Sequence, residues 1–206
     1  NETAGVTWRL STPNDTLFAY QVAVANDPRW WRACKNGLSP QSVIEVAKSF
    51  AAGVVISNEA RDLGIAVLSE TGAAATGMLD VWSLQDSEAI ESVSDIIPEI
   101  LGAAFSASNI RALYFERFEN DVDLLGYSRP WWKLQIEYPD FAMIQGKYEN
   151  RTCWVMTRSD FEIHSSSITD SVACLFIPLE QFFDLLLQTI TPVSTTLRMT
   201  PCRLQP

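Results

Sequence analysis

Asp80 is the first residue in this sequence whose setting suggests chemistry. It lies inside an otherwise apolar segment, Gly77 to Leu84, whose pattern predicts a β-strand. A carboxylate buried in such a strand has a raised pKa and can act as a general base. The competing interpretation places Asp80 on a sheet face that is open to water.

Glu116 is a second candidate carboxylate, in the predicted strand Ile110 to Phe118. Together with Glu119, near the end of this strand, it could form an acid–base pair. Side chains alternate between the two faces of a strand, so Glu116 points away from the face of Phe115. This placement favours a charge on the rim or surface, and neither Asp80 nor Glu116 is assigned a catalytic role.

The single histidine and the cysteines indicate no further catalytic or metal site. His164 could form a Ser-His-Asp arrangement with Asp160 and a serine from Ser165 to Ser167, but no nucleophile-elbow motif accompanies it, which favours a solvated loop histidine. No two cysteines have the CxxC spacing of a zinc site. The four are Cys34, Cys153, Cys174 and Cys202. We expect reduced thiols, with two disulfides in a secreted protein as the alternative.

Four of the seven tryptophans form two adjacent pairs, and arginines flank both pairs. Trp and Arg are enriched at the energetic centres of protein interfaces. We therefore predict protein partners or self-association, with filling of the core as the equal alternative. The predicted interface residues are Trp30, Trp31, Arg129, Trp131 and Trp132.

The elements that must position these residues follow from apolar periodicity and turn signals. Thr16 to Trp31 suits either a helix or a strand. The longest predicted helix runs from Ser87 to Phe105, with Asp86 as its N-cap and Pro98 as a bend. The remaining predicted helices begin at Pro40 and Pro178, with a short helical turn over 121–126. The remaining predicted strands are 6–10, the hairpin 54–57 and 65–68, 133–138, 152–157, 172–177 and 194–200.

This order of elements is that of a mixed α/β (α+β) protein, and over residues 53–132 it resembles the GNAT fold of acyl-CoA-dependent N-acyltransferases. The segment Asp123-Leu-Leu-Gly-Tyr127 is similar to the leucine-Gly-aromatic ending of that family's fourth helix. The resemblance implies a central mixed sheet flanked by helices in one domain over 1–206. Residues 172–206 would add a C-terminal β-α-β extension.

The resemblance also implies an acetyl-CoA site before the helix at Ser87, with Gln85 and Ser87 as candidate cofactor-binding residues. The family's glycine-rich turn is replaced here by 83–88, which contains no Gly and carries Asp86 and Glu88. These carboxylates would compete with a pyrophosphate for the helix N–H groups. The position of the family's tyrosine acid falls on Val122, which cannot donate a proton. The expectation is therefore no cofactor, or acetyl-CoA if the protein is an enzyme.

Composition restricts the possible partners. The chain has a formal net charge of −10 and no basic stripe, so we expect that nucleic acid is not a partner. No apolar run reaches the roughly 20 residues of a membrane span. We expect an intracellular or virion-associated protein. N-x-[ST] patterns at Asn1, Asn14 and Asn150 favour a secreted protein as the alternative.

Three functions are consistent with these features of the sequence. The lost glycine turn, the missing tyrosine and the Trp/Arg pairs favour a non-catalytic structural or interaction protein on a GNAT-like fold, similar to internal virion proteins of short-tailed bacteriophages. The order of elements alone favours an N-acyltransferase that uses acetyl-CoA. The glycosylation patterns and the cysteines favour a secreted binding domain.

Overall fold

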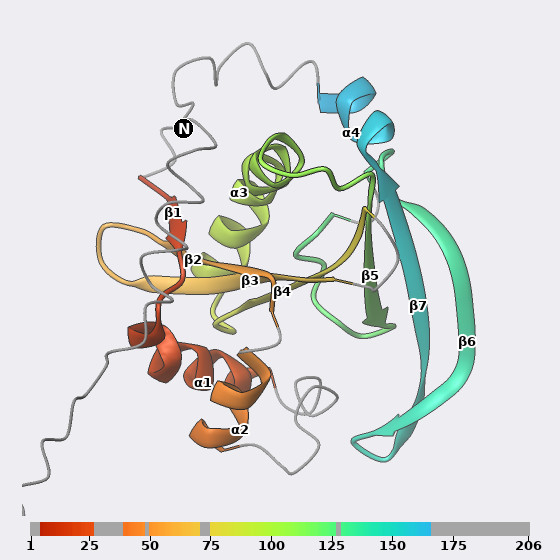
Figure 1. The fold of residues 1–206 in the computed structure, drawn as a ribbon. Helices are drawn as coiled ribbons and strands as arrows, with labels where there is room; N and C mark the ends of the chain where they lie inside the picture. Colours follow the sequence, from red (N-terminus) through yellow and green to blue (C-terminus); the bar gives the residue numbers. More distant parts are fainter. Residues whose placement is uncertain (1–4, 27–38, 48–49, 71–74, 127–128, 166–206) are drawn as a thin grey trace, which may run out of the picture. The chain divides into compact units, whose positions relative to one another are not determined.

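The computed structural model describes residues 5–26, 39–47, 50–70, 75–126 and 129–165. Within them, seven strands form one sheet in the order β1-β2-β3-β4-β5-β7-β6 (Figure 1). All neighbouring strands are antiparallel except β4 and β5, which are parallel. The strands are β1 (Thr7–Leu10), β2 (Ala52–Ser57), β3 (Asp62–Glu70), β4 (Thr76–Ser83), β5 (Ala112–Phe118), β6 (Lys133–Ile144) and β7 (Lys147–Thr157).

Helices cover both faces of the sheet (Figure 1). The first three are the 3-10 helix η1 (Pro13–Asp15), α1 (Thr16–Ala25) and α2 (Pro40–Ala47), and the other two are α3 (Ser87–Ser106) and α4 (Arg158–Ser165). α3 packs on one face, and α1 and α2 lie on the other. Among the described residues, no helix has the length and apolar character to cross a membrane.

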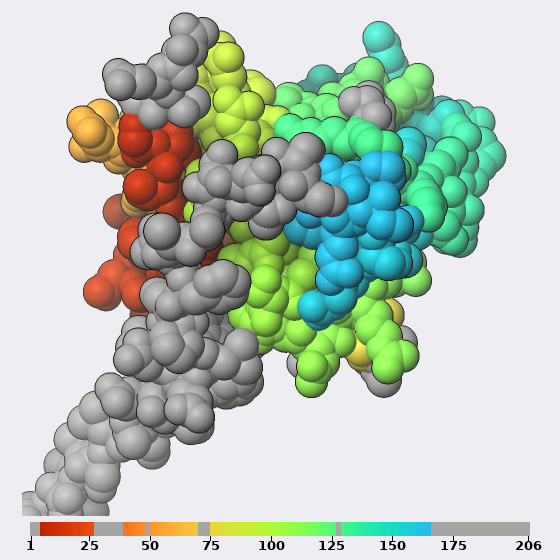
Figure 2. Space-filling model, turned by 90° about the horizontal axis from the view of Figure 1, so that it is seen from above, coloured from red at the N-terminus to blue at the C-terminus, as the bar shows by residue number. Residues whose placement is uncertain are grey.

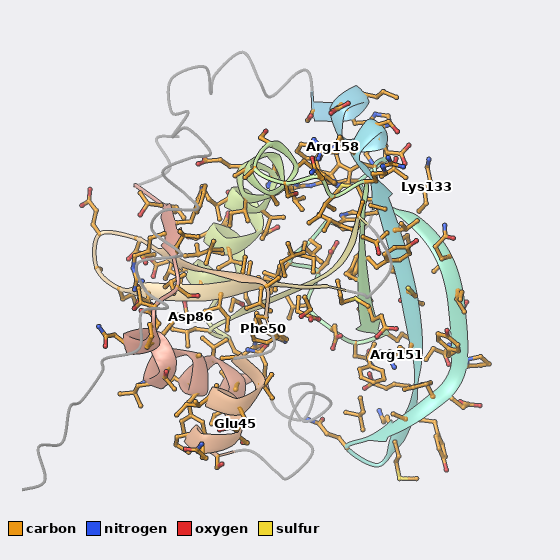
Figure 3. The ribbon with its side chains drawn as sticks, viewed as in Figure 1. Glu45, Phe50, Asp86, Lys133, Arg151 and Arg158 are labelled. Atoms are coloured by element: carbon orange, nitrogen blue, oxygen red, sulfur yellow. The ribbon has the colours of Figure 1, made fainter. Side chains whose placement is uncertain are left out.

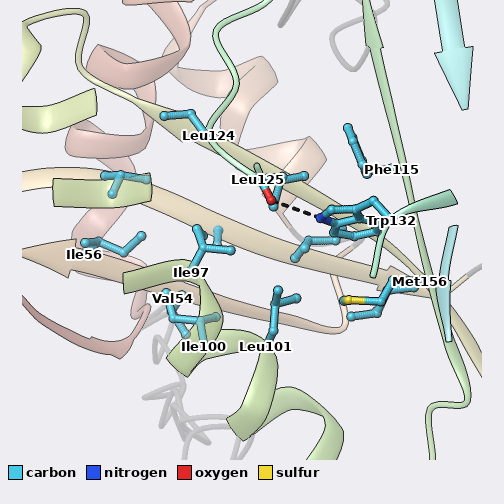
Figure 4. Packing of buried hydrophobic residues seen from close by; sticks show 14 of the residues in the cluster. Val54, Ile56, Ile97, Ile100, Leu101, Phe115, Leu124, Leu125, Trp132 and Met156 are labelled. Carbon is cyan, nitrogen blue, oxygen red and sulfur yellow. Dashed lines mark hydrogen bonds between the residues drawn. The ribbon is translucent and has the colours of Figure 1, made fainter. Parts of the chain in front are cut away.

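The position of α3 is set by its cap and by one apolar stripe. The Asp86 side chain accepts a hydrogen bond from the Ala89 N–H (3.0 Å), which satisfies one of the helix's unpaired donors. Val93, Ile97 and Leu101 then recur at helical spacing and are almost fully buried. They pack against β2, β4 and β5 residues in the larger core cluster (Figure 4).

The sequence predictions for the sheet and for α3 are confirmed. The hairpin at 54–68 is β2–β3, the strand at 77–84 is β4, and the mixed sheet flanked by helices is present. The ambiguous segment from Thr16 forms α1 as far as Ala25, because its apolar side chains pack with α2 and β3 in a smaller cluster. The predicted C-terminal extension at 172–206 lies outside the described residues, and the single-domain prediction stays a prediction.

The predicted helical turn over 121–126 is wrong. This segment is an irregular loop that ends at Gly126, whose φ of +59° is in the left-handed region. A β-carbon there would also meet the Arg129 Nε atom at 2.6 Å, so the position favours glycine. The loop buries Leu124 and Leu125 in the core, so hydrophobic burial is achieved without helical geometry.

Trp131 and Trp132 are core residues, with only 4% and 5% of their surface exposed. The Trp132 Nε1 donates to the Leu125 carbonyl (3.0 Å), and its ring packs edge-on against Phe115 (Figure 4). Of the two interpretations of this pair, core filling is therefore the one the structure supports, and the surface interface is corrected. Arg129 lies over the Trp131 ring, 5.4 Å from its centroid. Trp30 and Trp31 lie outside the described residues.

α4 closes the α3 face at the far end of the sheet. The Phe161 ring lies 5.5 Å from the Phe105 ring of α3 and 5.6 Å from that of Trp131. Arg158 donates to the carbonyls of Ser108 and Ile110, which ties α4 to the loop before β5. In Figure 2 the blue surface of α4 borders the green surface of α3 and this loop.

β6 is the outer strand of the sheet, and its backbone is irregular. Its pairing with β7 shifts register twice, between Leu134 and Ile136 and between Tyr138 and Ala142. The second shift contains Pro139, which has no N–H, and Asp140, whose φ is +49°.

We predict that Leu101→Ala destabilises the fold by about 2–5 kcal/mol, because the removed side chain leaves a cavity between α3 and the sheet. Leu101 is 1% exposed. The midpoint of unfolding in urea measures the effect. Glu91→Ala, at an exposed position of the same helix, is the control, and its free energy of unfolding should lie within about 0.5 kcal/mol of wild type. Equal urea midpoints for the two variants would contradict the packing of α3.

The ion pair between Arg9 and Asp15 predicts a pH-dependent contribution to stability. The hydrogen bond from Arg9, with further bonds from Thr12, lowers the pKa of Asp15 to about 2 from an ordinary value of 3.8. A carboxyl group whose pKa is lower in the folded protein than in the unfolded chain stabilises the fold at pH values above its unfolded pKa. For Asp15 this stability is lost as the pH falls from about 4 to 2. Asp15→Asn should therefore unfold more easily than wild type at pH 6, with the difference in unfolding midpoint shrinking as the pH falls from about 4 to 2. A difference that is constant from pH 6 to pH 2 would contradict it.

Candidate functional site

The parallel strands β4 and β5 part along their length. They pair at only three positions, Thr76 with Ala112, Gly77 with Leu113 and Met78 with Tyr114. Each strand has its other edge fully bonded, because β4 pairs with β3 as far as Ser83 and β5 pairs with β7 as far as Phe118. Beyond Met78 and Tyr114 the two facing edges have no pairing with each other. We call the pocket that lies there the wedge.

The wedge is lined by both strands and by the loop after β5. Its walls are formed by 79–82 of β4, 115–117 of β5 and 121–125 of the loop, with Asn26 and Gln85 at one end. The apolar part of this lining would exclude water from a bound group.

Asp80 and Glu116, the two candidates from sequence, both line the wedge. Their neighbours Leu79 and Phe115 belong to the core on the α3 side, so alternation places both carboxylates on the face of the sheet that carries α1 and α2. Glu116 forms an ion pair with Arg151 of β7, and 22% of its side-chain surface is exposed. Asp80 lies on β4, two residues beyond Met78, which is the last residue of this strand that pairs with β5.

Arg151 connects the two carboxylates electrostatically. It lies on β7 beside the end of β5 (Figure 3). Burial lowers the pKa of the Arg151 guanidinium, and the nearby Cys153 and Asp80 act in the opposite direction. Burial also raises the pKa of the free Cys153 thiol. Sequence patterns could not reveal Arg151, because only the pairing of β5 with β7 brings it to Glu116.

Gln85 is held at the end of the wedge by Asn26, the C-cap of α1. The Gln85 Nε2 donates to the Asn26 Oδ1 (2.9 Å), and the Asn26 Nδ2 donates to the Ser83 and Val22 carbonyls. Asn26 is 7% exposed and Gln85 is exposed, so this network runs from the interior of the fold to its surface. It fixes the end of β4 and the direction in which the chain enters α3.

The start of α3 is an ionic cluster. Arg61, in the turn between β2 and β3, donates to Asp86 (2.7 Å) and Glu88 (3.1 Å), and Asn58 also donates to Glu88. The hydrogen bond from Arg61, followed by that from Ala89, lowers the pKa of Asp86. Ser87 is the first, exposed residue of the helix. The sequence analysis foresaw the carboxylates but missed the arginine that balances them.

Of the residues in the Ser-His-Asp hypothesis, the structure describes Asp160, His164 and Ser165, whereas Ser166 and Ser167 lie outside the described residues. His164 is exposed on α4 rather than in a loop. Asp160 accepts hydrogen bonds from Lys133 and Thr157 (2.6 Å each), which anchor α4 to the start of β6. Within the described ranges, no group of three or more His, Cys, Asp or Glu side chains could hold a metal ion.

No family model and no curated protein matches this chain. Solved structures do match it. Spermidine/spermine N-acetyltransferase SpeG from Vibrio cholerae, in complex with manganese ions, is similar with a TM-score of 0.63 at 14% identity, over 78% of this chain and 97% of that one. A probable acetyltransferase from Staphylococcus epidermidis has a TM-score of 0.57 at 12% identity, over 75% of this chain and 99% of that one.

A chimera of the Vibrio cholerae spermidine N-acetyltransferase SpeG and hSSAT is similar with a TM-score of 0.61 at 13% identity, over 76% of this chain and 98% of that one. These acetyltransferases contradict the expectation of a non-catalytic structural protein and favour the N-acyltransferase alternative. The similarity to phage virion proteins receives no support. The chain therefore has the mixed-sheet fold of the GNAT N-acetyltransferases.

Proposed function

We propose that this protein is an N-acyltransferase that moves an acyl group from acetyl-CoA, or a related acyl-CoA, to an amine. The observation that carries the proposal is the wedge, a partly apolar pocket between two parallel strands that ends beside the start of a helix. An extended thioester arm with amide groups could lie between β4 and β5, where the two strands do not pair with each other. The fold of the acetyltransferase neighbours supports the same assignment.

The fit of acetyl-CoA differs between the two ends of this site. At the wedge, backbone groups of β4 and the apolar residues 124–125 would hold the thioester arm. At the start of α3, the Asp86 carboxylate already accepts the Ala89 N–H, and Arg61 supplies the nearby positive charge. Gln85 and Ser87 stay candidates for contacts at this end. The proposal therefore assigns the phosphate contacts to Arg61 and to helix N–H groups rather than to a glycine turn.

Asp80 is the proposed general base. Acyl-CoA supplies an activated thioester carbonyl, and the attacking amine must lose a proton as its nitrogen forms the new C–N bond and the C–S bond breaks. Asp80 faces the wedge and would accept that proton, while Arg151 stabilises the ionised carboxylate. Val122, which lines the same pocket, cannot protonate the leaving sulfur. Because a thiol is a much stronger acid than an amine, the sulfur can leave as a thiolate without prior protonation and then take a proton from water.

We predict that the protein releases free thiol from acetyl-CoA in the presence of primary amines, and that Asp80→Asn lowers kcat about a hundredfold or more with a small change in KM. Thiol release measured with a chromogenic disulfide follows the reaction. Glu119→Gln, an exposed carboxylate after β5, is the matched control and should keep wild-type rates. Absence of thiol release with every amine, together with no acetyl-CoA binding by calorimetry at 100 μM protein or above, would refute the proposal.

The ionic cluster at α3 predicts how acetyl-CoA affinity responds to charge. Glu88→Gln removes a negative charge near the proposed phosphate site and should tighten binding about threefold at low salt, while Arg61→Ala should weaken it by a similar or larger factor. Both effects should shrink in 0.5 M salt, because the side chains are exposed. Calorimetry measures the affinities, with Glu91→Gln, one turn further along α3, as control. Equal affinities in all four proteins would place the phosphates elsewhere.

A further inference from the structure

We propose that the acceptor amine carries its ammonium group on an apolar or aromatic body, and that this body lies on β6. The surface consists of Ile136, Tyr138 and Phe141, which we call the apolar strip. This inference rests on the proposed function, since the amine nitrogen must reach the wedge. It adds a class of acceptor and the residues that select it.

The apolar strip lies on the same face of the sheet as the wedge carboxylates. Ile136 is opposite Cys153, Cys153 is opposite Glu116, and residues directly opposite one another in antiparallel strands share a face. Tyr138 is likewise opposite Arg151. The strip is therefore the lateral continuation of the surface that contains Glu116.

A chain of contacts joins the strip to the wedge. Glu116 lines the wedge and pairs with Arg151, and the Arg151 guanidinium lies 4.7 Å from the centre of the Phe141 ring. The Phe141 ring is in turn 5.7 Å from the Tyr138 ring. Figure 3 shows Arg151 beside β7 at this end of the sheet. A molecule with its nitrogen near Asp80 could thus extend directly onto these rings.

The side chains of the apolar strip are exposed to solvent, where a ligand can contact them. The exposed fractions are 47% for Ile136, 38% for Tyr138 and 46% for Phe141, although each is a large apolar or aromatic side chain. Burial of adjacent apolar groups by a ligand is favourable in proportion to the area removed from water.

Charge selects the kind of amine. The wedge is lined by Asp80, Glu116, Asp121 and Asp123, whose carboxylates attract an ammonium group, whereas the charged group beside the Phe141 ring of the strip is the Arg151 guanidinium. A second cation on the acceptor would lie close to Arg151 and be repelled. The arrangement therefore favours a monocationic amine with an apolar body over a polyamine.

The test compares 2-phenylethylamine with spermidine, using calorimetry for binding and thiol release from acetyl-CoA for turnover. Ile136→Ser/Tyr138→Ser removes two members of the strip. Leu134→Ser/Met143→Ser is the matched control, because these residues are on the same strand, are 48% and 62% exposed, and lie opposite Trp154 and Tyr148 on the other face. Phe141→Leu serves as a second strip variant, and thermal unfolding of each variant confirms that it is folded.

We expect 2-phenylethylamine to bind more tightly than spermidine, and the strip variant to raise its Kd and KM about fivefold or more with kcat unchanged. The control should match wild type. The inference would be overturned if spermidine bound more tightly, or if the strip and control variants had equal effects. The proposed function would still stand in that case if thiol is released. If no amine supports thiol release but binding of 2-phenylethylamine still depends on the strip, the proposed function fails and the strip remains a binding surface.

Discussion

The limited pairing of β4 with β5 is the constraint on which the candidate site depends. Three parallel pairs hold the two halves of the sheet together, and each strand is bonded along its whole other edge, so neither can shift to close the gap. The same parting that weakens the centre of the sheet also makes the pocket.

Packing around the parted strands is achieved by an irregular loop. Leu124 and Leu125 fill the core beside Trp132, and the indole N–H of Trp132 satisfies the Leu125 carbonyl. The GNAT resemblance led us to expect a fourth helix at this place. Its volume is supplied instead by the loop and by the two tryptophans, and α4 follows β7.

Much of the fold could be predicted from local pattern, because α3 and the β2–β4 meander have clear periodicity, a capping Asp86 and turn residues. The loop over 121–126 could not, since its two consecutive leucines are buried by tertiary packing and not by a helix. For the site, Asp80 and Glu116 were visible as carboxylates in strands. Arg151 and Arg61 were not, because each reaches its partner only through strand pairing or a turn brought next to a helix.

The irregular backbone of β6 has a consequence for how copies of this protein can meet. An outer strand with regular pairing groups is a template for another strand, whereas register shifts, a proline and a left-handed residue interrupt the row of donors and acceptors. Continuous sheet extension through β6 is therefore disfavoured, and the long hairpin is protected from fibril-like stacking. Its apolar side chains stay available for contacts made side chain to side chain, which can be reversible and selective.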